Sequence, residues 1–405
     1  MEREQRMGGV KKHYRLRIIM PLLILALAGT FWIDLEVQAA DKPPYRFGLA
    51  MPMTGGQALF GADQVQAALW AVEDINAKGG VGQDKRKLEA IVLDTQADPK
   101  LGISMANRLA TVDKIPVFVT AWSSVVAAVA PVANREKVLC LSVGANSPKI
   151  AELGEYVYTT YPLSNVDITG IAQYAYNKMK KRTAAILYIN NDTGLYAARL
   201  YEEVFKKEGG KIVTVQSYEP TATDYTAQLM QIKNANPDII HLQGLVSDSP
   251  QVITQMRQLG IKQTVTSYQG LYNQKFLDQV GAAAGDIIIQ SMAPDADFHP
   301  PVKGYLEKWK KEKGRLPYGQ PYTQYVGDCP YIVKSLYEWV ESKKLPLTGE
   351  NMRQALLAVK TFDTPLVGKT VINANHTVDK PVYLIRVVNG KFTYMDTIKV
   401  EDIKK

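Results

Sequence analysis

Hydrophobic positions along the first half of the chain follow two alternating periodicities. Short apolar runs bounded by polar turns predict strands, and apolar residues spaced three or four positions apart predict helices. The clearest helix, Ala62–Ala77, ends at Gly79-Gly80, as helices commonly do. The predicted segments alternate strictly, from strand to helix and back: Tyr45–Ala50, Ala62–Ala77, Leu88–Leu93, Lys100–Val112, Val117–Thr120, Val125–Asn134 and Val138–Val143. This alternation is typical of a parallel, doubly wound α/β lobe.

The same alternation restarts near residue 168 and predicts a second lobe of similar size. Its predicted helices are Ile168–Lys180, Gly194–Glu208, Tyr225–Ala235 and Pro250–Leu259, and its strands are Ala184–Tyr188, Lys211–Ser217, Ile239–Leu242 and Thr264–Ser267. The last part of the chain is richer in helix, with Val302–Lys313, Pro330–Ser342 and Met352–Ala358 followed by strands at Val382–Val388 and Phe392–Ile398. Because it has too little strand for a third core, we expect it to fold back onto the first two lobes.

The N-terminus has the three-part pattern of a secretory signal peptide. A basic stretch precedes an apolar run from Ile18 to Ile33, and the small residues Ala39-Ala40 suit a signal peptidase. The alternative is an uncleaved anchor helix, but the run contains Pro21 and is shorter than the roughly 20 residues of a membrane span. We therefore expect residues 1–39 to be removed, with cleavage near Ala39 and a mature protein in the periplasm.

Composition agrees with two globular lobes and argues against nucleic-acid binding. The chain has 405 residues, more than the roughly 250–300 at which a single core stops growing. Part of its net charge of +8 lies in the basic N-terminal stretch, so the remainder is too dilute for a nucleic-acid footprint. Cys140 and Cys329 lie far apart in sequence, and a disulfide between them is neither required nor excluded.

No motif in the sequence calls for an enzyme, a cofactor or a metal. The chain has no Gly-x-Ser-x-Gly nucleophile elbow, no dinucleotide fingerprint and no phosphate loop. Its four His are scattered, and no Cys/His cluster has the spacing of a zinc site. We interpret carboxylate pairs such as Asp295 and Asp297 as solvated loop charges rather than as catalytic acids and bases.

Several short polar loops follow predicted strands, at the edge where open α/β sheets bind ligands. Ser123-Ser124 stands just ahead of the helix at Val125. Helix N-termini favour anions, so this pair is a candidate carboxylate cradle. The alternative is a plain N-cap, a position that Ser commonly occupies. Spacing alone does not decide between the two.

Sequence fragments in a fixed order carry a family likeness. They are Pro52-Met53-Thr54-Gly55, Gly61, Ala71 to Val81, Asp94 to Pro99, Ala185 to Tyr188, Glu202 to Gly210, Thr223-Asp224-Tyr225 and Asn236-Pro237-Asp238. Together they resemble the leucine/isoleucine/valine-binding proteins of bacterial ABC transporters, over nearly the whole chain after Tyr45. The resemblance implies two doubly wound parallel-sheet lobes joined by three hinge crossovers, the type I periplasmic binding fold. It implies residues 44–162 plus 295–379 for lobe one, and 163–294 plus 380–405 for lobe two.

The resemblance also implies the ligand-binding residues. The family's carboxylate-binding positions fall on Ser123, Gly144 and Asn146, where the family usually has Ser, a small residue and Thr. Phe60 and Trp122 fall on positions that line the ligand side-chain pocket. They imply flat apolar walls for a ring or a branched aliphatic group. The alternative for these two aromatic residues is packing in the lobe-one core.

The ammonium side of the implied site departs from the family pattern. Gln269 stands where the amino-acid binders have an acidic residue, and Thr193 and Leu245 stand where they have Tyr. The loss of a carboxylate removes the strongest partner for an ammonium, because charge-assisted hydrogen bonds are roughly twice as strong as neutral ones. An ordinary α-amino acid is therefore a less suitable ligand than the family alone implies.

We expect an extracytoplasmic, monomeric substrate-binding protein of a branched-chain-amino-acid-type ABC transporter. Its ligand is expected to be a small carboxylate-bearing solute, either an amino acid or a related organic or aromatic acid. Its partners are expected to be the permease subunits in the inner membrane, and it needs no cofactor. The alternatives are a receptor for a neutral amide or urea-like solute and a ligand sensor of the same fold.

Overall fold

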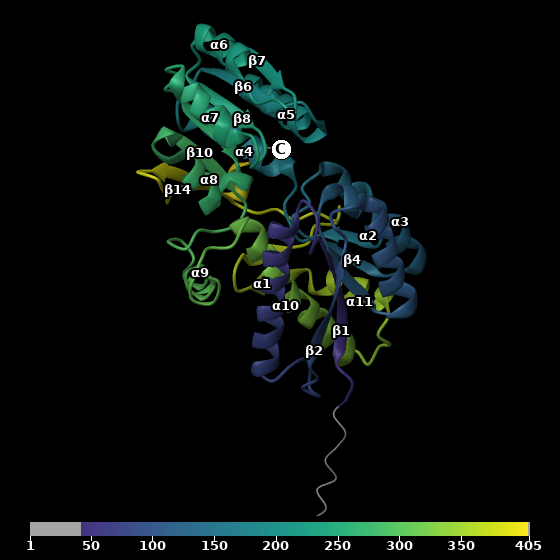
Figure 1. Ribbon diagram of the computed structural model, residues 1–405. Coiled ribbons are helices and arrows are strands. Elements are labelled where there is room, and N and C mark those ends of the chain that lie inside the picture. The colour runs from purple at the N-terminus through teal and green to yellow at the C-terminus, as the bar shows by residue number, and fades with distance from the viewer. Residues whose placement is uncertain (1–41, 404–405) are drawn as a thin grey trace, which may run out of the picture. The chain divides into compact units, whose positions relative to one another are not determined.

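A computed structural model describes residues 42–403, and in it five parallel strands form a first sheet (Figure 1). The strand order is β2-β1-β3-β4-β5. The strands are β1 (Tyr45–Met51), β2 (Leu88–Asp94), β3 (Val117–Thr120), β4 (Leu139–Ser142) and β5 (Val157–Thr159). Since β1 lies between β2 and β3, the order reverses there, which makes the β1/β3 boundary the topological switch point of this sheet.

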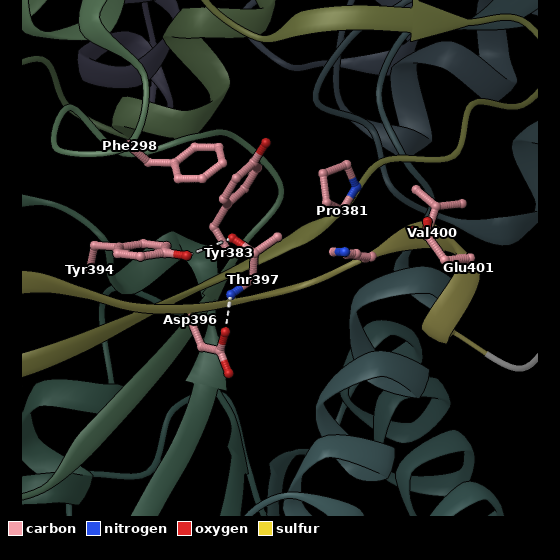
Figure 2. A pocket seen from close by; sticks show the side chains of 9 residues that line it. Phe298, Pro381, Tyr383, Tyr394, Asp396, Thr397, Val400 and Glu401 are labelled. Carbon is pink, nitrogen blue, oxygen red and sulfur yellow. Dashed lines mark hydrogen bonds between the residues drawn. The ribbon is translucent and has the colours of Figure 1, made fainter.

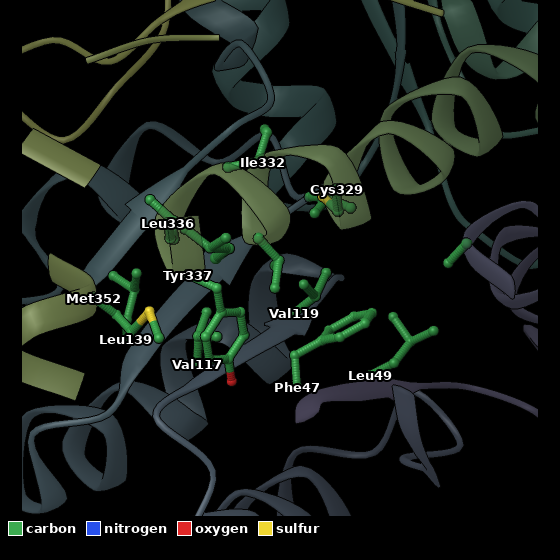
Figure 3. Packing of buried hydrophobic residues seen from close by; sticks show 14 of the residues in the cluster. Phe47, Leu49, Val117, Val119, Leu139, Cys329, Ile332, Leu336, Tyr337 and Met352 are labelled. Atoms are coloured by element: carbon green, nitrogen blue, oxygen red, sulfur yellow. The ribbon is translucent and has the colours of Figure 1, made fainter. Parts of the chain in front are cut away.

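Helices cover both faces of the first sheet. They are α1 (Ala58–Ala77), α2 (Pro99–Asn107), α3 (Ser123–Glu136), α10 (Gln320–Ser342) and α11 (Gly349–Val359). Successive strand residues point to opposite faces, so Phe47, Leu49 and Val119 pack against α1, α10 and α11, whereas Phe118 and Cys140 pack against α2 and α3. Figure 3 shows the first of these cores, with Leu336 and Tyr337 of α10 set against the strands. The late helices therefore complete the first lobe.

A second sheet holds seven strands in the order β14-β13-β10-β9-β8-β6-β7. These strands are β6 (Thr183–Ile189), β7 (Lys211–Tyr218), β8 (Ile239–Gln243), β9 (Thr264–Tyr268), β10 (Ile287–Ser291), β13 (Val382–Val388) and β14 (Lys391–Ile398). The first five are mutually parallel, and β13 and β14 add antiparallel strands at one edge. Order reversal between β6 and β8 gives this sheet its own switch point.

The second sheet is also covered on both faces. Its helices are α4 (Ser164–Asn177), α5 (Asp192–Lys207), α6 (Thr226–Ala235), α7 (Ser249–Gln258) and α8 (Gln274–Val280). Residues of α6, α7 and α8 form one core with Leu187 and Ile289, and residues of α4 and α5 form another with Ile186 and Ile288. A further helix, α9 (Pro300–Lys313), follows β10, and a small antiparallel hairpin of β11 (Thr361–Thr364) and β12 (Gly368–Val371) follows α11.

The chain passes between the two sheets three times: after β5, after β10 and after β12. The fold is thus α/β, with one parallel sheet and one mainly parallel sheet joined by three crossovers, as the resemblance to the family implied. The residue boundaries proposed for the two lobes stay a prediction.

Several predicted elements need correction. The helix predicted to begin at Pro330 begins at Gln320 and contains Pro330 in its interior, because Tyr325, Val326 and Cys329 belong to the same buried face as the residues after the proline. No strand was predicted at β5, β10, β11 or β12, and no helix was predicted at α8. The helix predicted over Lys100–Val112 ends at Asn107 and continues as a π-helical turn, Arg108–Val112.

The predicted signal peptide, residues 1–39, lies outside the described residues. Within residues 42–403, no helix is both long enough and apolar enough to span a membrane. Cys140 and Cys329 are free thiols, and both are buried.

Candidate ligand-binding site

The residues predicted to bind a ligand in the first lobe all follow strands β1, β3 and β4. These strands are neighbours, with Ala50 aligned with Thr120 and Thr120 aligned with Ser142. Phe60 lies in the first turn of α1 after β1, Trp122 and Ser123 follow β3, and Gly144 and Asn146 follow β4. Parallel strands end at one edge, so the structure places all five residues along the carboxyl edge of the sheet, beside its switch point.

Ser123 is the first residue of α3 and does not cap the helix. The alternative that Ser123 is a plain N-cap is therefore excluded. The residue before it, Trp122, takes the cap position with φ 65°, and no side chain caps this N-terminus among the described residues. The Ser123 Oγ instead accepts a hydrogen bond from the backbone N–H of Ser147 at 3.3 Å. A left-handed backbone is strained for a bulky residue such as Trp, and such strain is often found at functional sites.

The loop after β4 brings Gly144 beside α10 and Asn146 beside the start of α4. Gly144 has φ 73°, and a Cβ there would lie 3.1 Å from Cδ1 of Tyr322. The Asn146 carbonyl accepts from the Ser164 N–H at the start of α4. Tyr322 was not predicted, because it lies far from the other site residues in the chain and no motif marks it.

Phe60 and Trp122 are both partly buried. The Phe60 ring lies 6.5 Å from that of Tyr318, and a Cβ at Gly319 would lie 2.8 Å from Phe60 Cδ1. The Trp122 ring packs against the hydrophobic cores on both faces of the first sheet. Trp122 therefore has core contacts, whereas Phe60 lies beside the partly buried Tyr318, and a role in binding stays a prediction for both.

Three predicted residues follow strands of the second sheet. Thr193 is exposed in the first turn of α5, and Leu245 is 40% exposed after β8. Gln269, which follows β9, is only 2% exposed, and its Oε1 accepts from the Met292 N–H at 3.1 Å. Gln269 is thus at least partly a structural residue that ties the end of β9 to the chain after β10.

A cluster of tyrosines around Asp167 was also missed. Asp167 lies in the first turn of α4 and is 5% exposed, and burial raises its pKa to about 7. The rings of Tyr161 and Tyr322 stack with centroids 5.5 Å apart, and the charge of Asp167 adds to the effect of burial in raising the pKa values of both hydroxyls. The cluster connects the crossover after β5 with α4 and α10.

A pocket of about 460 Å³ lies away from all the predicted ligand residues, beside β13 and β14 (Figure 2). Phe298, Tyr383 and Tyr394 form its aromatic side. Its Asp396 already accepts hydrogen bonds from the Tyr174 hydroxyl and the Thr397 N–H, and the Tyr394 hydroxyl pairs with Thr397 Oγ1. Asp396, Tyr394 and Thr397 thus already have hydrogen-bond partners, so we do not assign the solute to this pocket.

Side chains suited to a metal do not cluster in the part of the chain that the structure describes, where no group of three or more His, Cys, Asp or Glu could hold an ion. His241 illustrates the point. It is fully buried in the second lobe and stacks on Tyr201 at 4.2 Å, and burial lowers its pKa to about 3, so it is a neutral core residue.

Comparison with known proteins identifies close architectural relatives. A family model described as periplasmic binding protein matches residues 44–391. The Leu/Ile/Val-binding protein homolog 7 of Brucella suis is 29% identical over 336 residues, covering 78% of this chain and 81% of the relative. LivJ of Streptococcus pneumoniae in complex with isoleucine superposes with a TM-score of 0.76 at 21% identity, covering 88% of this chain and 99% of LivJ. A solute-binding protein of Rhodopseudomonas palustris BisB5 in complex with 3,4-dihydroxy benzoic acid superposes with a TM-score of 0.72 at 22% identity. This match covers 88% of this chain and 98% of the Rhodopseudomonas protein.

Proposed function

Because this chain belongs to the periplasmic binding protein family and is a substrate-binding protein of the leucine/isoleucine/valine-binding type, we propose that it captures a small solute bearing a carboxylate and delivers it to an ABC transporter. The proposed place of action is outside the cytoplasm, and the proposed partners are permease subunits. A relative binds isoleucine and another binds a dihydroxybenzoic acid, which supports a carboxylate as the shared feature.

The observation that carries this proposal is the uncapped N-terminus of α3 at the switch point of the first sheet. The free N–H groups of a helix N-terminus and its dipole favour an anion. In the proposed site, Ser123 Oγ, the Gly144 backbone and the Asn146 side chain would surround this end of the helix, and the hydrogen bond from the Ser147 N–H to Ser123 Oγ supports this by placing the loop after β4 beside it. A solute carboxylate placed there would complete the hydrogen bonding that no side chain supplies.

Replacing Ser123 with Ala is expected to weaken binding of a carboxylate solute by about 1.5–3 kcal/mol, the usual contribution of a hydrogen bond to a charged group. Calorimetry with isoleucine, benzoate and a 2-keto acid measures this loss. The matched control is Ser124→Ala, since Ser124 is exposed on the same helical turn. Equal affinity in wild type and Ser123→Ala, with a lowered melting temperature, would show that Ser123 serves the fold alone.

Replacing Gln269 with Glu is expected to shift preference from a 2-keto acid toward the amino acid of the same shape. The new carboxylate keeps an acceptor for the Met292 N–H and adds a counter-charge that attracts an ammonium and repels a second acid. Calorimetry with leucine and its 2-keto acid measures the ratio of the two dissociation constants, with exposed Gln258→Glu as the control for added charge. An unchanged ratio would remove Gln269 from the ligand site.

A further inference from the structure

Asp167 stands among buried polar groups whose hydrogen bonding is incomplete. Its Oδ2 receives only a long hydrogen bond, 3.4 Å, from Gln290 Nε2, and its Oδ1 accepts from the adjacent Ile168 N–H. Gln290 and Tyr161 are both fully buried, and among residues 42–403 the Gln290 Oε1 and the Tyr161 hydroxyl have no hydrogen-bond partner of normal geometry. Buried polar groups are nearly always paired, so this cluster is built to receive a group that the described residues do not provide.

Contacts place this cluster between the two halves of the proposed site. Tyr322, which stacks on Tyr161, also lies against Gly144 of the carboxylate cradle. On the second sheet, Gln290 is aligned with Tyr268, the residue just before Gln269.

Asp167 itself lies on α4 of the second lobe, and α5 of the same lobe also lies close to it. Tyr196 lies one turn after Thr193, and the Asp167 charge raises its pKa, in addition to the effect of burial. A carboxyl that is adjacent to residues of both lobes is well placed to select what binds between them.

We propose that Asp167 is a specificity-determining residue of the solute site, where its carboxylate, with the Tyr161 hydroxyl beside it, accepts a hydrogen bond from the phenolic hydroxyl of a hydroxylated aromatic acid. This inference rests on the proposed function, because the carboxylate of the same solute occupies the cradle at α3.

The geometry favours a hydroxylated aromatic acid over an α-amino acid. The Tyr322 ring lies between Gly144 and the Asp167 cluster, so a solute that reaches both ends extends past an aromatic ring. In 4-hydroxybenzoate a benzene ring separates the carboxylate from the hydroxyl, whereas a single carbon joins the two charged groups of an α-amino acid. The flat walls predicted at Phe60 and Trp122 suit the same ring.

The hydrogen bond is expected to depend on pH with a definite sign. The groups facing Asp167 are Tyr161, Tyr196 of α5, Tyr322 of α10 and the uncharged Gln290 of β10, and all three tyrosines have raised pKa values. Between pH 5.5 and 8, Asp167 is thus the member of this group that titrates, since burial raises its pKa to about 7. A phenol that donates to the carboxylate favours the ionised form, so its binding tightens as the pH rises. Benzoate brings a negative charge without a donor and favours the protonated form.

The test is calorimetry with 4-hydroxybenzoate and benzoate at pH 5.5 and pH 8, on wild type and Asp167→Asn. Wild type is expected to prefer 4-hydroxybenzoate roughly 10- to 100-fold at pH 8, as a hydrogen bond to a charged group implies, and several-fold less at pH 5.5. Asp167→Asn is expected to lose most of this preference and its pH dependence. Asp396→Asn, which removes a carboxylate that contacts α4 through Tyr174 outside the cluster, is expected to behave as wild type.

Tyr161→Phe keeps the stacked ring and removes the hydroxyl. It is expected to reduce the preference for 4-hydroxybenzoate over benzoate in part. This variant provides the test if Asp167→Asn fails to fold. An unchanged preference in the folded variants overturns the inference, and so does a wild-type preference that is independent of pH. If the wild type binds isoleucine but binds neither benzoate nor 4-hydroxybenzoate, the inference is overturned and the proposed function stands. Wild type that binds no carboxylate overturns both.

Discussion

Replacing Asp328 with Ala is expected to lower the free energy of unfolding by about 3–5 kcal/mol, the usual effect of removing one partner from a buried charged network. Asp328 is 1% exposed in α10, and its carboxylate accepts hydrogen bonds from the Leu366 and Val367 N–H groups at 2.7–3.0 Å. These N–H groups belong to the turn between β11 and β12, so the substitution leaves two backbone donors unpaired.

Lys380 also hydrogen-bonds to the backbone at this turn between β11 and β12. Its Nζ donates to the Val367 and Lys369 carbonyls at 2.9 and 2.7 Å. Burial raises the pKa of Asp328 to about 6 and lowers that of Lys380 to about 8, so desolvation exceeds the attraction between the two charges. Removing Asp328 alone takes away the negative charge that most strongly favours the buried Lys380 ammonium and leaves only the weaker effect of Asp363.

Chemical denaturation of Asp328→Ala, Lys380→Met and the double variant measures this coupling. We expect the double variant to lose less stability than the two single changes together, because it leaves no unpaired charge. Exposed Asp278→Ala is the control for loss of a surface carboxylate. Additive losses would show that Asp328 and Lys380 hold the turn independently.

The long helices and most strands could be predicted because the spacing of apolar residues along each segment shows which of its faces is buried. The nearly continuous apolar runs of β1 and β3, which are buried on both faces, and the helical spacing of α1 follow directly from which side chains are buried. The signal for β10 was also present, as three consecutive Ile before Gln290, but it was missed. By contrast, β5 has only three residues, and nothing local distinguishes it from a loop.

Long-range packing explains the larger errors. Pro330 suggested a helix start because Pro is common in the first turn. In the structure the buried residues on both sides of it, such as Val326 and Val333, make one continuous face against the first sheet, and this packing outweighs the lost hydrogen bond.

From strand ends alone, the candidate residues of each lobe could be assigned to the carboxyl edge of a sheet, where the structure has them. The positions of strand ends did not predict the Asp167 cluster, because Tyr161, Tyr322 and Gln290 are brought together only by the crossovers. Sequence distance hides such clusters unless a family motif marks them.

Replacing Gly61 with Ala is expected to lower the free energy of unfolding by roughly 3 kcal/mol, at the upper end of the usual cost of overpacking. A Cβ on Gly61 would lie 1.8 Å from the Pro52 carbonyl oxygen, much closer than any real contact. The loop that contains Pro52 has little freedom to retreat, because Asp94 accepts hydrogen bonds from the Met53 N–H at 2.8 Å and the Thr54 hydroxyl at 2.6 Å. Either α1 or the loop after β1 must therefore move.

The same displacement is expected to weaken solute binding, because Phe60 precedes Gly61 on α1 and lies at the proposed site. Denaturation and calorimetry on Gly61→Ala measure both effects. The matched control is Gly56→Ala in the same loop, where an added Cβ meets no atom within 4 Å, so its stability is expected to stay within about 0.5 kcal/mol of wild type. A stability loss for Gly61→Ala with unchanged affinity would place Phe60 outside the binding site. Equal stability of the two variants would mean that the loop after β1 yields more readily than its bonds to Asp94 indicate.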